Sequence, residues 1–122
     1  MEYQFETIDN VLKVSLEGRL VAACAEEFKE TMMEHLRGQR NILFDMTKMA
    51  HIDSSGLGAL VSLLQWVNTN GGSIKLANIQ PRPWIVFDIT KVHRVFDIYA
   101  TVEEALDAFR NGNSGDSPKP SA

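Results

Sequence analysis

Alternating hydrophobic and polar residues open the chain and predict a β-hairpin. Residues 3–7 alternate between two faces, residues 11–16 do so again, and Asp9-Asn10 lies between them as a turn. Because every second side chain of a strand shares one face, each segment is typical of a strand buried on one side. We expect the two strands to pair across the turn and the second strand to end at Gly18.

Hydrophobic residues then recur at intervals of three and four positions, which predicts an amphipathic helix over residues 22–37. The residues expected on its buried face are Ala25, Phe28, Met32 and Leu36. Gly38 is typical of the end of a helix. The apolar run at residues 41–46 indicates a strand that is covered on both faces.

Helices and strands continue to alternate in the second half of the chain. We expect helices that begin near Ser54, near Pro81 and at Val102, and strands over residues 73–78 and 95–99. A capping box formed by Thr101 and Glu104 marks the start of the last helix. This order predicts an α/β domain, with a mixed sheet and helices packed mainly on one of its faces.

The chain is predicted to divide into one domain and a tail. Residues 111–122 contain Gly, Ser, Asn and Pro without periodic hydrophobic residues, so we expect a flexible C-terminal tail. The domain is expected to span residues 1–110, a length that suits one hydrophobic core.

Composition narrows the classes of function. The 122 residues contain 12 Lys and Arg against 16 Asp and Glu, a net charge of −4, without the basic stripe that nucleic-acid binding requires. The hydrophobic runs are too short to cross a bilayer, and no secretion signal opens the chain. Cys24 is the single cysteine, so no internal disulfide can form, which fits a reducing compartment. We therefore expect a cytoplasmic protein that neither binds nucleic acid nor inserts into a membrane.

A segment of small and polar residues, Asp53-Ser54-Ser55-Gly56-Leu57-Gly58, follows the apolar strand and opens an apolar helix. Local sequence leaves two interpretations of Ser54 open. It could cap the helix, or it could carry a phosphate where the free N–H groups of the first helical turn would hold the anion. Gly56 and Gly58 would leave the N-terminus of the helix free of bulky side chains, so that the backbone of another protein could approach closely.

Enzymatic and cofactor chemistry fit this segment poorly. A serine hydrolase of the common fold needs a Gly-x-Ser-x-Gly elbow, which is absent, and His51 lying near Ser54 in sequence is not the geometry of a catalytic triad. Gly56-x-Gly58 lacks the third glycine of a dinucleotide site and the Lys-Ser/Thr pair of a phosphate loop. The three histidines lie far apart, and one cysteine adds no ligand cluster. We expect no catalytic residue, no cofactor and no metal.

Trp84 and Ile85 form a candidate surface outside this segment. In a helix over residues 82–90, Val86 and Phe87 would face the core, and Trp84 and Ile85 would point partly away from it. Two interpretations remain open. The helix is either buried on all sides or exposes these two residues as a partner-binding patch, because tryptophan is enriched at binding hot spots.

The chain resembles the STAS domain family, which comprises bacterial anti-sigma factor antagonists and related domains attached to sulfate transporters. The resemblance covers residues 3–110 and is most specific in Asp53-Ser54-Ser55-Gly56-Leu57-Gly58. The supporting segments are residues 16–20, 25–28, 42–46, 71–76 and 92–96. It implies a mixed sheet of four or five strands with about four helices.

The resemblance also implies a function, that of an anti-sigma factor antagonist. Ser54 would accept a phosphate from a serine kinase of the histidine-kinase-like ATPase type, which is typically the anti-sigma factor itself. The unphosphorylated antagonist would bind this kinase and free the sigma factor, and a phosphatase of the PP2C type would reset the phosphorylated form. Asp53 would orient the serine, the segment Gly56-Leu57-Gly58 would admit the partner, and Ser55 is the alternative acceptor.

Three departures from the family pattern bear on this function. Val21 stands where the family usually has an aspartate near the phosphorylation site, so a contact with the kinase or another partner is expected to differ. Lys91 takes the place of the glycine that usually ends the third helix, and Trp84-Ile85 replace residues that are commonly charged. Val21 and the apolar pair favour an alternative function: a constitutive interaction subunit, for example of a membrane lipid transporter, that is never phosphorylated.

Overall fold

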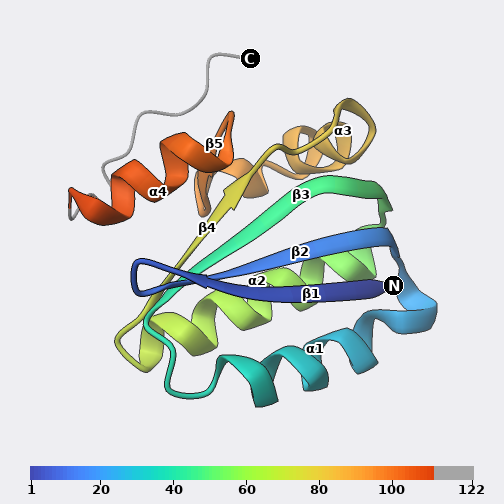
Figure 1. The fold of residues 1–122 in the computed structure, drawn as a ribbon. Helices are drawn as coiled ribbons and strands as arrows, with labels where there is room; N and C mark the ends of the chain where they lie inside the picture. Colours follow the sequence, from blue (N-terminus) through green and yellow to red (C-terminus); the bar gives the residue numbers. More distant parts are fainter. Residues whose placement is uncertain (112–122) are drawn as a thin grey trace.

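The five strands of the sheet lie in the same order as in the sequence, β1-β2-β3-β4-β5 (Figure 1). The structure is a computed structural model that describes residues 1–111. The elements are β1 (Glu2–Ile8), β2 (Val11–Leu20), α1 (Ala22–Leu36), β3 (Asn41–Ile52), α2 (Ser54–Thr69), β4 (Ser73–Ala77), α3 (Pro81–Thr90), the 3₁₀ helix η1 (Val92–Arg94), β5 (Asp97–Tyr99) and α4 (Val102–Arg110). β1 and β2 are antiparallel and each later pair is parallel, so the sheet is mixed, as predicted. Apart from Asn111, the predicted tail at residues 111–122 lies outside the described residues.

Three helices cover one face of the sheet because each connects two neighbouring parallel strands. The strands from β2 to β5 advance across the sheet in one direction, and right-handed crossovers then place α1, α2 and α3 on the same side. Phe28 of α1, Leu60 of α2 and Phe87 of α3 accordingly share one buried core with Phe44 of β3. The predicted packing of helices mainly on one face is therefore confirmed.

The last helix, α4, packs on the opposite face. Leu43, the neighbour of Phe44 in β3, points to this face and forms a second, smaller core with Leu106 of α4. Lys75 of β4 is fully buried beside this core, with its Nζ 3.2 Å from Asp97 Oδ2 and 4.8 Å from the ring centre of Phe109. The buried ammonium thus has a carboxylate and an aromatic face as neighbours, which offset the cost of removing it from water.

Local predictions that rest on periodicity and capping are confirmed. Asp9 and Asn10 both have positive φ, 48° and 69°, as the tight turn between two antiparallel strands requires. The residues buried along α1 are those predicted, Ala25, Phe28, Met32 and Leu36. The hydroxyl of Thr101 accepts the N–H of Glu104 at 3.1 Å at the start of α4.

The predicted strand ends are wrong where the two-residue period is interrupted. β2 does not end at Gly18, which has a φ of 113° beside a register shift, but continues to Leu20. β3 runs on to Ile52 well beyond its apolar segment, because the same register shifts break the alternation that marks a strand in the sequence. β5 begins at Asp97 rather than at residue 95, because Val95 ends η1 in a helical conformation and its N–H donates to the Val92 carbonyl oxygen at 2.9 Å.

Candidate functional site

The ends of β2 and β3 bring the starts of two helices together. Leu20 and Ile52 are register partners at the carboxyl ends of these parallel strands. The helix α1 begins at Ala22 and α2 begins at Ser54, each two residues after its strand (Figure 1). Two helix N-termini, each with the positive end of a helix dipole, therefore lie at the same edge of the sheet.

Asp53 joins these two helix N-termini. Its Oδ1 accepts the N–H of Gly56 at 2.9 Å, which caps α2, and its Oδ2 accepts the N–H of Ala22 at 2.9 Å in the first turn of α1. Val21 precedes α1 but makes no side-chain cap bond. The N–H of Gly56 is the main cause that lowers the pKa of Asp53, with further donation from Ala22 and Ser55. One ionised carboxylate therefore caps both helices.

Ser54 is not the helix cap, which was one interpretation of the sequence. Asp53 holds that position, so Ser54 and Ser55 are the first two residues of α2, and both are exposed. Within residues 1–111, neither hydroxyl makes a hydrogen bond with another protein group. The N–H groups of Gly56 and Ala22 already donate to Asp53, so two of the groups at these helix starts are not free for a phosphate on Ser54.

The two glycines that follow have different surroundings. Gly56 is buried, and a Cβ on it would lie 2.8 Å from Leu20 Cγ and clash with the Leu20 carbonyl oxygen. Its missing side chain therefore lets α2 pack against β2, and it does not open the helix entrance as expected. Gly58 is exposed, and a Cβ on it would meet no atom within 4 Å. Because Leu57 is buried as well, only Gly58 leaves room for a partner.

A shallow groove of about 440 Å³ lies between α1 and α2. Its lining is small or polar and consists of Ala22, Ala25, Glu26, Lys29, Ser55, Gly58, Ala59 and Ser62. Glu26 and Lys29 form an ion pair at 3.4 Å on the α1 side. Ser55 faces this groove whereas Ser54 does not line it, so the two candidate acceptors have different surroundings.

Trp84 lies on α3 and is not among the residues at the starts of α1 and α2. Its ring stacks on Phe87 with 6.4 Å between ring centres and meets His93 at 5.7 Å. Trp84 is half-buried against the main core, whereas Ile85 is 56% exposed and Ile89 is 73% exposed. The helix α3 is therefore not buried on all sides, and its exposed hydrophobic face consists of Ile85 and Ile89. Their four-residue spacing in the sequence was the signal that could have identified Ile89.

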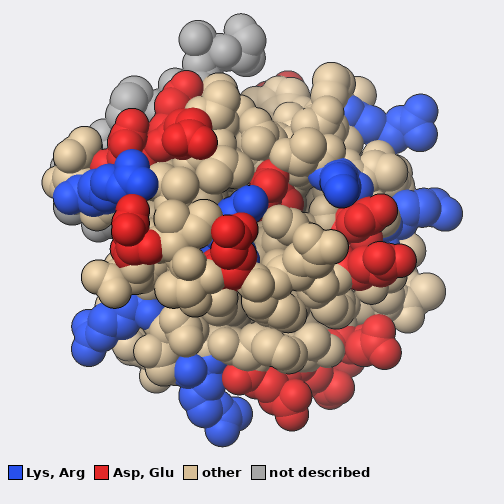
Figure 2. All heavy atoms as spheres, viewed as in Figure 1, with Lys and Arg blue, Asp and Glu red and all other residues tan. Residues whose placement is uncertain are grey.

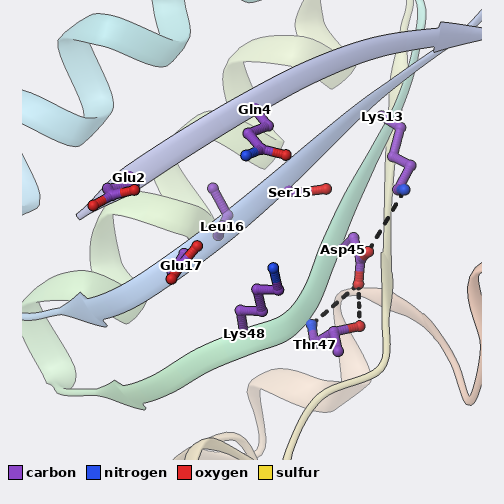
Figure 3. Close-up of a pocket in the computed structure, with 9 residues that line it drawn as sticks. All are labelled: Glu2, Gln4, Lys13, Ser15, Leu16, Glu17, Asp45, Thr47 and Lys48. Carbon is purple, nitrogen blue, oxygen red and sulfur yellow. Dashed lines mark hydrogen bonds and ion pairs between the residues drawn. The ribbon is translucent and has the colours of Figure 1, made fainter.

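The sequence did not predict a polar pocket of about 270 Å³ on the open face of β1, β2 and β3 (Figure 3). Lys13 Nζ lies 3.7 Å from Glu6 and 3.8 Å from Asp45, and Asp45 also accepts the N–H and hydroxyl of Thr47. Acidic and basic side chains are interspersed over this side of the molecule (Figure 2). The charges around the pocket therefore compensate one another.

The described residues provide no metal site and no arrangement typical of a serine enzyme. Among residues 1–111, no group of three or more His, Cys, Asp or Glu side chains could hold a metal ion. Nδ1 of His35 lies 2.9 Å from the Thr31 carbonyl oxygen, and Nδ1 of His93 lies 3.2 Å from that of Phe87. The helices in this part of the chain are all too short or too polar to cross a membrane.

A family model identifies the family of this chain, and solved structures share its fold. The family model described as STAS domain matches residues 2–105. The anti-sigma-B factor antagonist of Bacillus subtilis (strain 168) is 28% identical over 95 residues, which are 78% of this chain and 87% of that protein. An anti-sigma factor antagonist from Mycobacterium paratuberculosis has a similar structure, with a TM-score of 0.80 at 20% identity over 89% of this chain and 93% of that one. The phosphorylated form of the Bacillus cell fate determinant SpoIIAA gives a TM-score of 0.67 at 23% identity over 89% of this chain and all of that one.

Proposed function

The chain belongs to the STAS domain family, and we propose that it is an anti-sigma factor antagonist switched by phosphorylation of Ser54. In the unphosphorylated state it binds an anti-sigma factor that is also a serine kinase of the histidine-kinase-like ATPase type. Phosphorylation of Ser54 ends this binding, and a phosphatase of the PP2C type restores it. The working unit is the domain of residues 1–110, acting in the cytoplasm.

The exposed hydroxyl of Ser54 at the first position of α2 is the observation that carries this proposal. This hydroxyl makes no hydrogen bond within residues 1–111, so a kinase can bind and phosphorylate it without breaking a contact of the fold. Its backbone is held in place because Asp53, the preceding residue, is bonded to both α1 and α2. The named relatives are anti-sigma factor antagonists, and SpoIIAA has a phosphorylated form, which supports the same assignment.

A phosphate on Ser54 would change the surface and leave the fold intact. It adds about 1.5 to 2 negative charges and three acceptor oxygens. Neither cap bond of Asp53 uses the Ser54 hydroxyl, so both helix starts keep their partners. A protein that docks on the first turn of α2 and on the groove beside Gly58 would meet the new charge directly. The switch therefore acts on the partner, because the charge has to be desolvated when the two proteins associate.

The proposed role of the site is binding, without a catalytic step. A serine nucleophile needs a base within hydrogen-bond reach, and no histidine in residues 1–111 is bonded to Ser54 or Ser55. The carboxylate of the preceding residue, Asp53, is occupied by two backbone N–H groups. Hydrolysis of generic esters or nucleotides that is lost in Ser54→Ala would contradict this part of the proposal.

The proposal is tested by the intact mass of the protein isolated from its native cells. We expect a species heavier by one phosphate that is absent from Ser54→Ala and retained in the matched variant Ser55→Ala. Affinity capture with the unphosphorylated protein is expected to retain a histidine-kinase-like ATPase, and capture with the phosphorylated protein is not. Two results together would contradict the switch: unmodified protein under all growth and stress conditions, and capture of a transporter ATPase. They would support the alternative function, a constitutive interaction subunit, which Val21 and the apolar face of α3 favour.

A further inference from the structure

We propose that Asp53 keeps a phosphate on Ser54 turned outward, because its carboxylate lies beside the serine and already holds one backbone N–H group at the start of each helix, that of Gly56 in α2 and that of Ala22 in α1. The inference rests on the proposed function in taking Ser54 as the acceptor. It adds a role for Asp53 as a positioning residue, which determines how the modified serine is presented to a partner.

Two of the N–H groups that a phosphate could use, one in each helix, are already taken. Free N–H groups in the first turn of a helix are common ligands of phosphate. Here the N–H of Gly56 in α2 and the N–H of Ala22 in α1 each donate to Asp53 at 2.9 Å. These bonds hold the carboxylate in its ionised form, so it does not give them up by protonation near neutral pH. A phosphate that turned inward would have to displace this carboxylate from both helices.

The position of Asp53 also adds repulsion. It directly precedes Ser54 in the chain, so the two Cα atoms are about 3.8 Å apart. A carboxylate and a phosphate dianion at such close positions repel each other, and turning the phosphate into water lowers this repulsion. The inward orientation is therefore disfavoured by both lost hydrogen bonds and charge.

The neighbouring cations do not offset this effect. Lys29, across the groove, is paired with Glu26 at 3.4 Å. Arg19 and His51 are register partners on β2 and β3, each one residue before a core residue of its strand. Within residues 1–111, neither side chain forms an ion pair with Asp53. His51 contributes less to the lowered pKa of Asp53 than the Gly56 N–H does.

The test is a ³¹P NMR titration of the full chain with phosphoserine introduced at position 54 during translation. For an outward phosphate we expect a second phosphate pKa equal to or above that of a phosphopeptide spanning residues 50–58. We also expect the backbone ¹H–¹⁵N signals of Ala22 and Gly56 to remain at their unphosphorylated positions. Asp53→Asn should lower the phosphate pKa by about half a pH unit, because one nearby charge is removed.

Asp88→Asn is the matched control, because it removes the same charge from an exposed residue of α3. We expect it to leave the phosphate pKa unchanged. A phosphate pKa below that of the peptide, with shifted Ala22 and Gly56 signals, would overturn the inference. Comparison of the phosphorylated chain with the phosphopeptide tests the outward orientation even if Asp53→Asn does not fold. No kinase is used, so absence of the phosphate in native cells would refute the proposed function and leave this measurement valid.

Discussion

Replacing Asp53 by alanine should destabilise the protein more than removal of an ordinary helix cap. The substitution deletes one carboxylate and leaves two N–H groups, those of Gly56 and Ala22, without their acceptor. Val21 cannot substitute for it at α1, because a valine side chain has no acceptor atom. The prediction therefore concerns two helices although only one residue changes.

The structure sets the expected size of the effect. Loss of a helix N-cap costs about 1 kcal/mol, and a hydrogen bond to a charged acceptor contributes about 1.5 to 3 kcal/mol. Because Asp53 caps two helices and both bonds are at 2.9 Å, we expect a loss of about 2 to 3 kcal/mol in the free energy of unfolding. For a domain of this size, that corresponds to a decrease in Tm of about 10 °C.

Urea unfolding followed by circular dichroism measures this loss, and Thr101→Ala is the matched control. Thr101 caps α4 alone through one bond, from the N–H of Glu104 at 3.1 Å. Its removal should cost about 1 kcal/mol. Equal losses for the Asp53→Ala and Thr101→Ala variants would show that the bond to Ala22 contributes nothing, which would refute the double cap.

The effect of Asp53 should also depend on pH. Because the folded state has the lower pKa, the stabilisation by Asp53 is fully present above the unfolded value of about 3.9 and is lost as the pH falls through the folded value. The difference in stability between the natural protein and Asp53→Ala should therefore shrink below about pH 4. The difference for Thr101→Ala should stay constant, because a hydroxyl does not titrate in this range. A constant difference for both variants would contradict the charged cap.

Four further substitutions test other features of the structure. Lys91 ends α3 in the left-handed conformation, with φ 63° and ψ 16°, so Lys91→Gly should stabilise the domain by about 1 kcal/mol in urea unfolding, and no gain would contradict this strain. Gly56→Ala should destabilise by about 2 kcal/mol or more because its Cβ meets Leu20, whereas Gly58→Ala should stabilise by up to about 1 kcal/mol and weaken partner capture. Equal effects of the two glycine substitutions on unfolding would refute their different surroundings. Trp84→Ala should lower the free energy of unfolding by about 2 kcal/mol in differential scanning calorimetry, because the ring packs against the core. An unchanged Tm would contradict this and favour a partner-binding role for Trp84.

Some features of the site could be predicted from the sequence because they depend on neighbours along the chain. An acidic residue and two serines before an apolar helix indicate a helix start, and the structure begins α2 at Ser54. The choice between Asp53 and Ser54 as the cap could not be made in this way, because both residue types are good caps. What distinguishes them is the second hydrogen bond of Asp53, to Ala22, which is 31 positions away in the chain.

The role of Gly56 shows the same limit. A glycine near a helix start suggests either an open approach or a close packing contact, and the sequence cannot separate the two. The contact with Leu20 exists only because β2 extends past Gly18 and ends beside β3. The buried Lys75 was not foreseen for a related reason, since its partners Asp97 and Phe109 come from β5 and α4.

The sequence alone determined which segments become helices and strands, where the hairpin turns, and which family the chain resembles, because periodicity, capping and turn chemistry act over a few residues. Only the tertiary structure decided where β2 and β3 end and which carboxylate caps both helices. It also decided which glycine is open and which hydrophobic residues of α3 stay exposed. These features depend on strand register and on contacts between residues far apart in the chain. Such contacts leave no periodic signal in the sequence.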